Sequence, residues 1–189
     1  KEGKVIENAD SLADEIAKID GVKIALPEIE EQAFAIFNQQ QMPVVIKGVD
    51  SLCQQLIKID SVIIDGNFLL RDSIANYAIL SPGVAMKLGA RPGYINPIGI
   101  YVPTRTGHIN PSNPMTAFCA DSLWVSSVFQ VNQPEYDNDR IIIPIENARN
   151  LLEYTTQAHS VGIGILDNAD INATAQKIAQ KIGPKYDIK

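Results

Sequence analysis

The sequence predicts an α+β protein made of two subdomains. Helix-like and strand-like segments alternate near both ends of the 189-residue chain, whereas its middle is rich in strand-like runs. A polar stretch with two prolines, residues 104–114, separates two of these middle strands. Alternation at the ends around a strand-rich centre is typical of proteins whose sheet and helices are segregated. The length allows one domain or two small ones with a real core.

Composition narrows the class of protein. The 46% hydrophobic and 20% charged residues are ordinary for a soluble globular domain. The net charge of −6 argues against nucleic acid as a partner and against a polybasic membrane-surface patch. No run approaches the ~20 apolar residues of a membrane span. The chain starts Lys-Glu-Gly-Lys without a signal peptide, so we expect it to be part of a longer protein.

Two helices are expected in the first third of the chain. In NADSLADEIAKIDG, Ser11 and Asp14 resemble a capping box and Gly21 is expected to close the helix. The stretch DSLCQQLIKIDSV, from Asp50, echoes DSLADEIAKIDGV, from Asp10. The echo is either an internal repeat or two similar helix-then-strand units. The second interpretation is favoured, because no fixed period continues downstream.

Strands are expected between and after these helices. Residues 22–38 and 39–50 predict strands around a polar turn at Gln39–Met42, and residues 62–64 predict a short buried run before an Asp65-Gly66 turn. The later strands are expected at 98–102, 119–131, 141–143 and 160–166, with a strand-like end at 186–188.

The sequence predicts three further helices. Tyr77–Leu80 reads as a strand followed by a short helix, with Ser81 as N-cap, Pro82 at the first position and Gly89 as C-cap. Residues 141–143 enter a helix that has Pro144 near its first turn. The last helix has one apolar stripe and stops at Gly183-Pro184; the stripe is Ile171, Ala175, Ile178 and Ile182.

The sequence shows no catalytic constellation. It lacks a G-x-S-x-G elbow and a P-loop, and Gly162 and Gly164 lie inside a strand, where packing is favoured over cofactor binding. His108 is either a general base or, as we favour, a solvated or partner-contacting residue. The acidic run 135–139 is read as a polar turn rather than a calcium loop. We therefore expect no catalytic residue, cofactor or metal site, and look for function in binding surfaces.

The cysteines give a weak indication of compartment. Cys53 and Cys119 could form a disulfide in an oxidising environment, but two unbridged thiols are favoured. Their spacing relative to His108 and His159 matches no zinc site.

Four segments together resemble a known family. They are NYAILSPGVAMKLGARPG (76–93), VVIKGVD (44–50), RIIIPIENARNLLEY (140–154) and the closing strand and helix, 160–182. Their order resembles the extracytoplasmic core domain of MacB-like and FtsX-like ABC transporter permeases over nearly the whole chain. Within that family, the order and the long hairpin look most similar to the lipoprotein-releasing permeases LolC and LolE.

The resemblance implies an organisation and a set of partners. Residues 1–49 and 155–189 would form a membrane-proximal βαβ-type (Porter-like) subdomain, and residues 50–154 an inserted (Sabre-like) subdomain. The domain would lie on the periplasmic side of a bacterial inner membrane. Its partners would be a cytoplasmic ATPase subunit, a second permease copy and a periplasmic lipoprotein chaperone similar to LolA. The fragment itself would hold no ATP site.

The polar stretch would then be the protruding hairpin, called the hook, that enters the chaperone. A hairpin normally needs only ~2–5 loop residues, and prolines keep such a tip extended. An ordinary flexible loop is the alternative, and apolar residues are few in the stretch. Within it we expect Arg105, Ile109 and Pro111 to supply charge, apolar anchor and rigidity. The complete candidate set is Thr104, Arg105, Thr106, Gly107, His108, Ile109, Asn110, Pro111, Ser112, Asn113 and Pro114.

Two alternatives to lipoprotein release stay open. The domain could instead serve a MacB-type efflux or FtsX-type cell-division permease that binds another periplasmic partner. A periplasmic hydrolase would need a clustered acid, base and nucleophile, which the sequence does not show.

Overall fold

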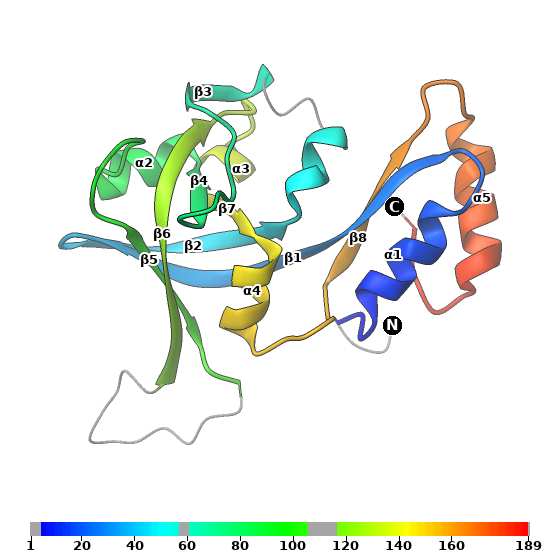
Figure 1. Cartoon of the computed structure of the whole chain (residues 1–189), viewed down its shortest axis with the longest axis horizontal. Coiled ribbons are helices and arrows are strands. Elements are labelled where there is room, and N and C mark those ends of the chain that lie inside the picture. Colours follow the sequence, from blue (N-terminus) through cyan, green and yellow to red (C-terminus); the bar gives the residue numbers. More distant parts are fainter. Residues whose placement is uncertain (1–4, 57–60, 106–116, 189) are drawn as a thin grey trace.

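A computed structural model describes residues 5–56, 61–105 and 117–188 of the chain and confirms the α+β class. In these ranges the protein forms eight strands, five α-helices and one 3-10 helix (Figure 1). The elements are α1 (Ala9–Ala17), β1 (Val22–Phe37), β2 (Gln40–Val49), η1 (Ser51–Gln55), β3 (Ile63–Gly66), β4 (Tyr77–Leu80), α2 (Pro82–Leu88), β5 (Ile98–Pro103), β6 (Phe118–Phe129), α3 (Pro134–Asp137), β7 (Arg140–Pro144), α4 (Ile145–Leu152), β8 (Ser160–Ile165) and α5 (Ile171–Ile182).

Six of the strands pair in a ring that closes on itself. The order is β1-β2-β7-β4-β6-β5, and β5 returns to β1 through residues 34–36. The β2–β7 and β4–β6 pairs are parallel and the other four are antiparallel. Closing a sheet removes the free edges of its members. Two strands lie outside the ring: β3 pairs with β6, and β8 pairs with the first half of β1.

The main hydrophobic core is formed by side chains from one face of each ring strand. Successive side chains of β1 point to opposite faces of the sheet, so Ala33, Ala35 and Phe37 are buried, whereas Phe34 is 47% exposed. Helices α2 and α4 pack on the same cluster through Val84, Leu88, Ile145, Ala148, Leu151 and Leu152.

A second, smaller unit lies beside the ring. The first half of β1, Val22–Glu28, pairs with β8, and α1 and α5 cover this ribbon (Figure 1). The packed side chains of this cluster are Ala13, Ile16, Val22, Ala25 and Ile178. Both ends of the described chain belong to this unit, and β1 is shared by the unit and the ring.

The division at residues 49/50 and 154/155 stays a prediction. Strand β2, placed by the sequence in the unit of the chain ends, hydrogen-bonds to β1 on one side and to β7 on the other. It therefore lies in the same ring as the strands of residues 77–144.

Two helices differ from expectation, α1 in where it begins and α5 in which positions it buries. Helix α1 begins at Ala9 with Asn8 as N-cap, so the capping box expected from Ser11 and Asp14 is wrong. The backbone N–H of Ala9 donates to Thr156 O at 3.0 Å, so a long-range contact sets the start of the helix. In α5, Ile171 is 68% exposed, and the buried positions are Thr174 and Ile178 rather than the expected full stripe.

Several strand expectations are also corrected. The β1–β2 turn is tighter than expected, because Phe37 already pairs with Gln40. Ile64 is 57% exposed, since β3 lies at the edge of the sheet. Asp65 and Gly66 are the last two residues of this strand and pair with β6, where a turn was expected. Residues 134–137 form the short helix α3 where a polar turn was expected, and residues 186–188 form no strand.

The segment from β4 to α2 is confirmed in detail. Pro82 opens the helix, and Gly89 ends it with φ 67° and ψ 24°, a left-handed conformation that glycine adopts without strain. Ser81 is the N-cap residue, but its side chain makes no cap hydrogen bond; instead its Oγ accepts from the Arg140 N–H at 3.2 Å. Pro144 likewise precedes α4 as expected.

Candidate functional site

The base of the β5–β6 hairpin is the part of the expected docking element that the structure describes. The two strands pair from Ile98↔Leu123 to Pro103↔Phe118, and Thr104 continues the ladder by donating its N–H to Ala117 O at 2.8 Å. These strands extend away from the ring, toward the bottom of the view, while α1 and α5 lie to its right (Figure 1). Of the candidate residues, only Thr104 and Arg105 are described. Residues 106–114, including Ile109 and Pro111, lie outside the described ranges.

Arg105 is held by residues of its own chain. Its Nη2 lies 3.2 Å from Glu31 Oε2, and its Nη1 donates to the Tyr154 hydroxyl at 2.5 Å. The guanidinium carbon also lies 5.1 Å from the centre of the Tyr154 ring, a cation–π distance. Arg105 thus connects the hairpin base to β1 and to the residues that follow α4. Its side chain is still 44% exposed, so part of the guanidinium remains accessible.

These contacts extend to the part of β1 where its pairing partner changes from β8 to β2. The Tyr154 hydroxyl lies 3.3 Å from His159 Nε2, and His159 Nδ1 lies 2.8 Å from Glu30 O. The Glu30 N–H is also 3.2 Å from Nδ1, but one ring nitrogen cannot both donate and accept. The shorter contact favours the tautomer in which Nδ1–H donates to Glu30 O. Arg105 then donates a hydrogen bond to the Tyr154 hydroxyl, the hydroxyl donates to His159 Nε2, and His159 Nδ1–H donates to Glu30 O.

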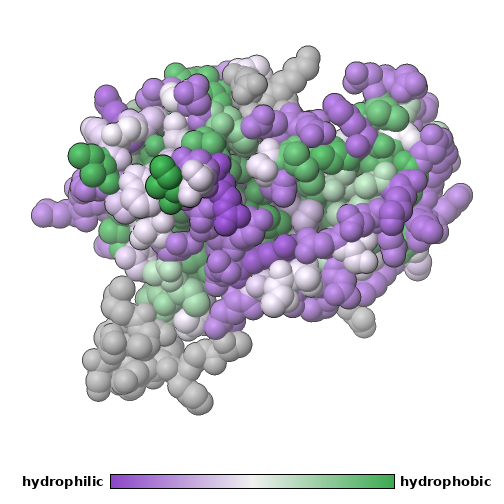
Figure 2. Space-filling model, viewed as in Figure 1, coloured by the Kyte–Doolittle hydropathy of each residue, from purple (hydrophilic) through white to green (hydrophobic). Residues whose placement is uncertain are grey.

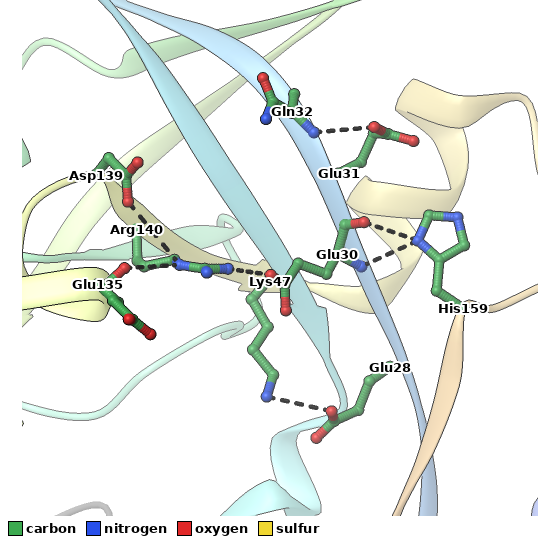
Figure 3. Close-up of polar contacts among 9 residues, drawn as sticks. All are labelled: Glu28, Glu30, Glu31, Gln32, Lys47, Glu135, Asp139, Arg140 and His159. Atoms are coloured by element: carbon green, nitrogen blue, oxygen red, sulfur yellow. Dashed lines mark hydrogen bonds and ion pairs between the residues drawn. The ribbon is translucent and has the colours of Figure 1, made fainter. Parts of the chain in front are cut away.

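A row of carboxylates on β1 makes further ion pairs beside this network (Figure 3). Glu28 pairs with Lys47 at 3.2 Å, and Glu30 pairs with Arg140 of β7. Arg140 is also 3.9 Å from Asp139 Oδ1, and its guanidinium lies 5.0 Å from the Tyr136 ring centre. The two cations in this region therefore each have an anionic partner.

An apolar cavity of about 390 Å³ opens next to these ion pairs. One wall is the outer side of the ring and the other is formed by η1, β3 and α3. The ion-paired side chains of Glu28, Lys47 and Arg140, with Gln133, contribute the polar part of the lining. The remaining lining residues are Val49, Cys53, Val62, Ile63, Ile79, Phe129, Val131, Tyr136 and Ile142.

Both cysteines are free thiols in the structure. Burial, together with the smaller effect of the nearby carboxylates of Asp50 and Glu28, raises the pKa of the Cys53 thiol to about 11. Burial also raises the pKa of Cys119. Thiols with raised pKa values are poor nucleophiles at neutral pH.

Within the described ranges, no group of three His, Cys, Asp or Glu side chains could hold a metal ion. The longest helix there, α5, has 12 residues, and none has the length and apolar character needed to cross a membrane.

Sequence reasoning missed both the Arg105 network and the cavity. Arg105 lies 74 residues from Glu31 and 49 from Tyr154, so no local spacing relates them. The cavity residues come from β1, β2, η1, β3, β4, β6, α3 and β7 and from the residues between them, and no periodicity in one segment indicates that they meet.

Comparison with known proteins identifies the fold. No family model and no curated protein sequence matches the chain. Among solved structures, the extracellular domain of the noncanonic ABC-type transporter YknZ from Gram-positive bacteria is similar, with a TM-score of 0.65 and 15% identity over 94% of this chain and 82% of that one. The periplasmic region of MacB from Actinobacillus actinomycetemcomitans is also similar, with a TM-score of 0.64 and 10% identity over 94% of this chain and 74% of that one. The chain therefore shares the fold of extracytoplasmic domains of ABC-type transporters.

Proposed function

We propose that this chain is the extracytoplasmic domain of a bacterial ABC transporter permease, on the periplasmic side of the inner membrane. The observation that supports this most directly is the shared fold, which extends over 94% of the chain in both comparisons. Both described ends belong to the α1–α5 unit, which lies beside the ring, whereas the β5–β6 hairpin extends from the ring itself in another direction (Figure 1). This separation suits a domain that is attached to a membrane through its ends and binds a partner elsewhere on its surface. A cytoplasmic ATPase subunit and a second permease copy would complete the transporter.

The domain acts by binding and not by catalysis. His159 and Tyr154, which are groups that enzymes often use, contact the Glu30 backbone and the Arg105 guanidinium. Cys53 lines an apolar cavity, and its raised pKa keeps the thiol protonated. The Tyr154 hydroxyl next to His159 accepts from the Arg105 guanidinium, so we assign this pair to holding the hairpin base and not to nucleophilic chemistry.

The specific partner is a periplasmic lipoprotein chaperone of the LolA type, which docks on residues 104–114 while the transporter releases lipoproteins from the membrane. Two observations support the location. The β5 and β6 strands extend beyond the ring, and Arg105 fixes the base of the hairpin to Glu31 and Tyr154. A hairpin with a fixed base loses less conformational freedom when it docks.

The comparisons favour a second candidate function. YknZ and MacB, the transporters named above, share the fold, so the domain could instead serve a MacB-type efflux or an FtsX-type cell-division permease. The same hairpin would then bind another periplasmic protein.

The test is to shorten the hairpin and measure binding. Residues 106–114 are replaced by Asn-Gly, which leaves the Arg105 anchor in place, and Ile95→Ala, at an 89% exposed position, serves as a control. Calorimetry then measures binding of each variant to the LolA-like chaperone of the same organism. We expect the shortened variant to lose binding and to keep its melting temperature, since a protruding tip adds little to its own core.

The outcomes separate the two candidates. Undiminished chaperone binding by the folded short variant would show that the hairpin is not the docking element. If the unmodified domain does not bind the chaperone but binds an efflux adaptor or a cell-division partner, the proposed role in lipoprotein release is wrong and the second candidate function is supported.

A further inference from the structure

We propose that the apolar cavity beside β1 is a binding site for an uncharged, apolar small molecule. The site lies outside the ring of strands, between β2, β4, β6 and β7 on one side and η1, β3 and α3 on the other. It is separate from the β5–β6 hairpin, so it goes beyond the function proposed above.

The size of the cavity is the first argument. Protein interiors are packed so closely that voids larger than a water molecule are few. The 390 Å³ here falls within the ~300–1,000 Å³ typical of small-molecule pockets. Aliphatic and aromatic side chains form most of the lining, and water in contact with such surface is unfavourable. A bound apolar molecule would remove that cost.

The packing around the cavity is the second argument. Val49, Cys53, Ile79 and Phe129 are buried, and they belong to one hydrophobic cluster that spans both walls. Three of these residues come from the ring strands β2, β4 and β6, and Cys53 comes from η1. The walls are thus held by buried residues on regular elements, which favours a preformed site. On the face of the molecule shown in Figure 2, hydrophobic and hydrophilic residues are interspersed.

The charges near the cavity decide the class of ligand. Lys47 is paired with Glu28, and Arg140 is paired with Glu30 and close to Asp139. Each cation is therefore already matched, and a charged ligand group would have to break one of these pairs or stay unpaired. Burying an unpaired charge is costly, whereas an uncharged apolar body meets only the aliphatic and aromatic walls. Charge complementarity thus favours a neutral ligand.

The experiment uses two dyes that differ in charge. N-phenyl-1-naphthylamine is uncharged, and 8-anilino-1-naphthalenesulfonate has the same ring systems with an added sulfonate. Both gain fluorescence in an apolar environment. We expect the neutral dye to bind the 189-residue chain saturably at one site, and the sulfonate to bind at least tenfold more weakly. Absence of saturable binding of the neutral dye overturns the proposal, and equal affinity of the two dyes overturns the assignment of an uncharged ligand.

Variants locate the dye. Val131→Phe and Ile142→Phe enlarge two partly buried side chains of the lining, and each should weaken binding of the neutral dye at least tenfold. Ile95→Phe makes a comparable change at an exposed position outside the lining and should leave binding unchanged. If the lining variants are folded by circular dichroism and still bind with the original affinity, the dye lies elsewhere and the proposal fails.

A second measurement covers the case in which a variant does not fold. Cys53 lines the cavity and Cys119 does not, so the unmodified chain contains both a reporter and an internal reference. Iodoacetamide is applied at pH 9 with and without saturating neutral dye, and the two sites are quantified by peptide mass spectrometry. The dye should slow modification of Cys53 at least fivefold and leave Cys119 unaffected. Equal slowing at both cysteines, or slowing at neither, contradicts binding in this cavity.

Discussion

Replacing Arg105 by alanine should destabilise the domain, because the structure uses this side chain to fix the hairpin base. Three contacts would be lost: the ion pair with Glu31 at 3.2 Å, the hydrogen bond to the Tyr154 hydroxyl and the cation–π contact with the Tyr154 ring. An exposed ion pair contributes about 0.2–1 kcal/mol. An exposed cation–π contact contributes about 0.5–1 kcal/mol, and a hydrogen bond about 0.5–1.5 kcal/mol.

The contributions overlap, since one side chain makes all three contacts and is 44% exposed. We therefore expect the free energy of unfolding to fall by about 1–2 kcal/mol, toward the lower end of the sum. For a chain of this size, 1 kcal/mol corresponds to about 2–4 °C in melting temperature.

The assay is urea unfolding followed by circular dichroism, combined with a double-mutant cycle. Tyr154→Phe removes the hydroxyl and keeps the ring, so the cycle with Arg105→Ala isolates the hydrogen bond. Arg105→Lys keeps the charge but loses the planar group and should be intermediate. A stability change of Arg105→Ala below about 0.3 kcal/mol, with no coupling to Tyr154, would refute the anchoring role. Arg105 would then be free to act only as the docking charge expected from the sequence.

Three further predictions concern other parts of the chain. Gly83→Ala should lower the free energy of unfolding by about 3 kcal/mol, because the new Cβ would lie 2.2 Å from the Asn138 carbonyl oxygen. Gly89→Ala should lower it by about 1 kcal/mol through backbone strain alone, because its Cβ would have no atom within 4 Å. The reverse order in urea unfolding would contradict this reasoning. Alkylation of the unreduced, denatured protein should modify both Cys53 and Cys119, and a mass with neither modified would reveal a disulfide. The chain should show no ATP binding in calorimetry, because its sequence has no P-loop, and micromolar affinity would contradict the binding-domain assignment.

Local chemistry made part of the fold predictable. The segment from Tyr77 to Gly89 combines a strand, a proline at the helix start and a glycine at its end, and each residue type has one favoured place in such a unit. The same holds for Pro144 before α4. These elements depend on neighbours in the sequence, so reading the sequence in order finds them.

Long-range contacts account for the expectations that were wrong. The start of α1 depends on Thr156 O, which lies far along the chain from Ala9. The exposed side of β3 depends on its place at the edge next to β6, which the run Val62–Ile64 does not indicate. For the site, the sequence predicted where a partner would dock through the resemblance to a family. It did not indicate that Arg105 contacts its own chain.

Strand β1 has a mechanical consequence. It is 16 residues long, or about 50 Å when extended, and it belongs to the α1–α5 unit at one end and to the ring at the other. Units joined by loops can turn about a few flexible residues. Here the link is a continuous strand that is hydrogen-bonded to β8 and then to β2, with His159 and Arg105 attached at the junction. A displacement of one unit must therefore twist or bend this strand, and the strand transmits that displacement to the hairpin base.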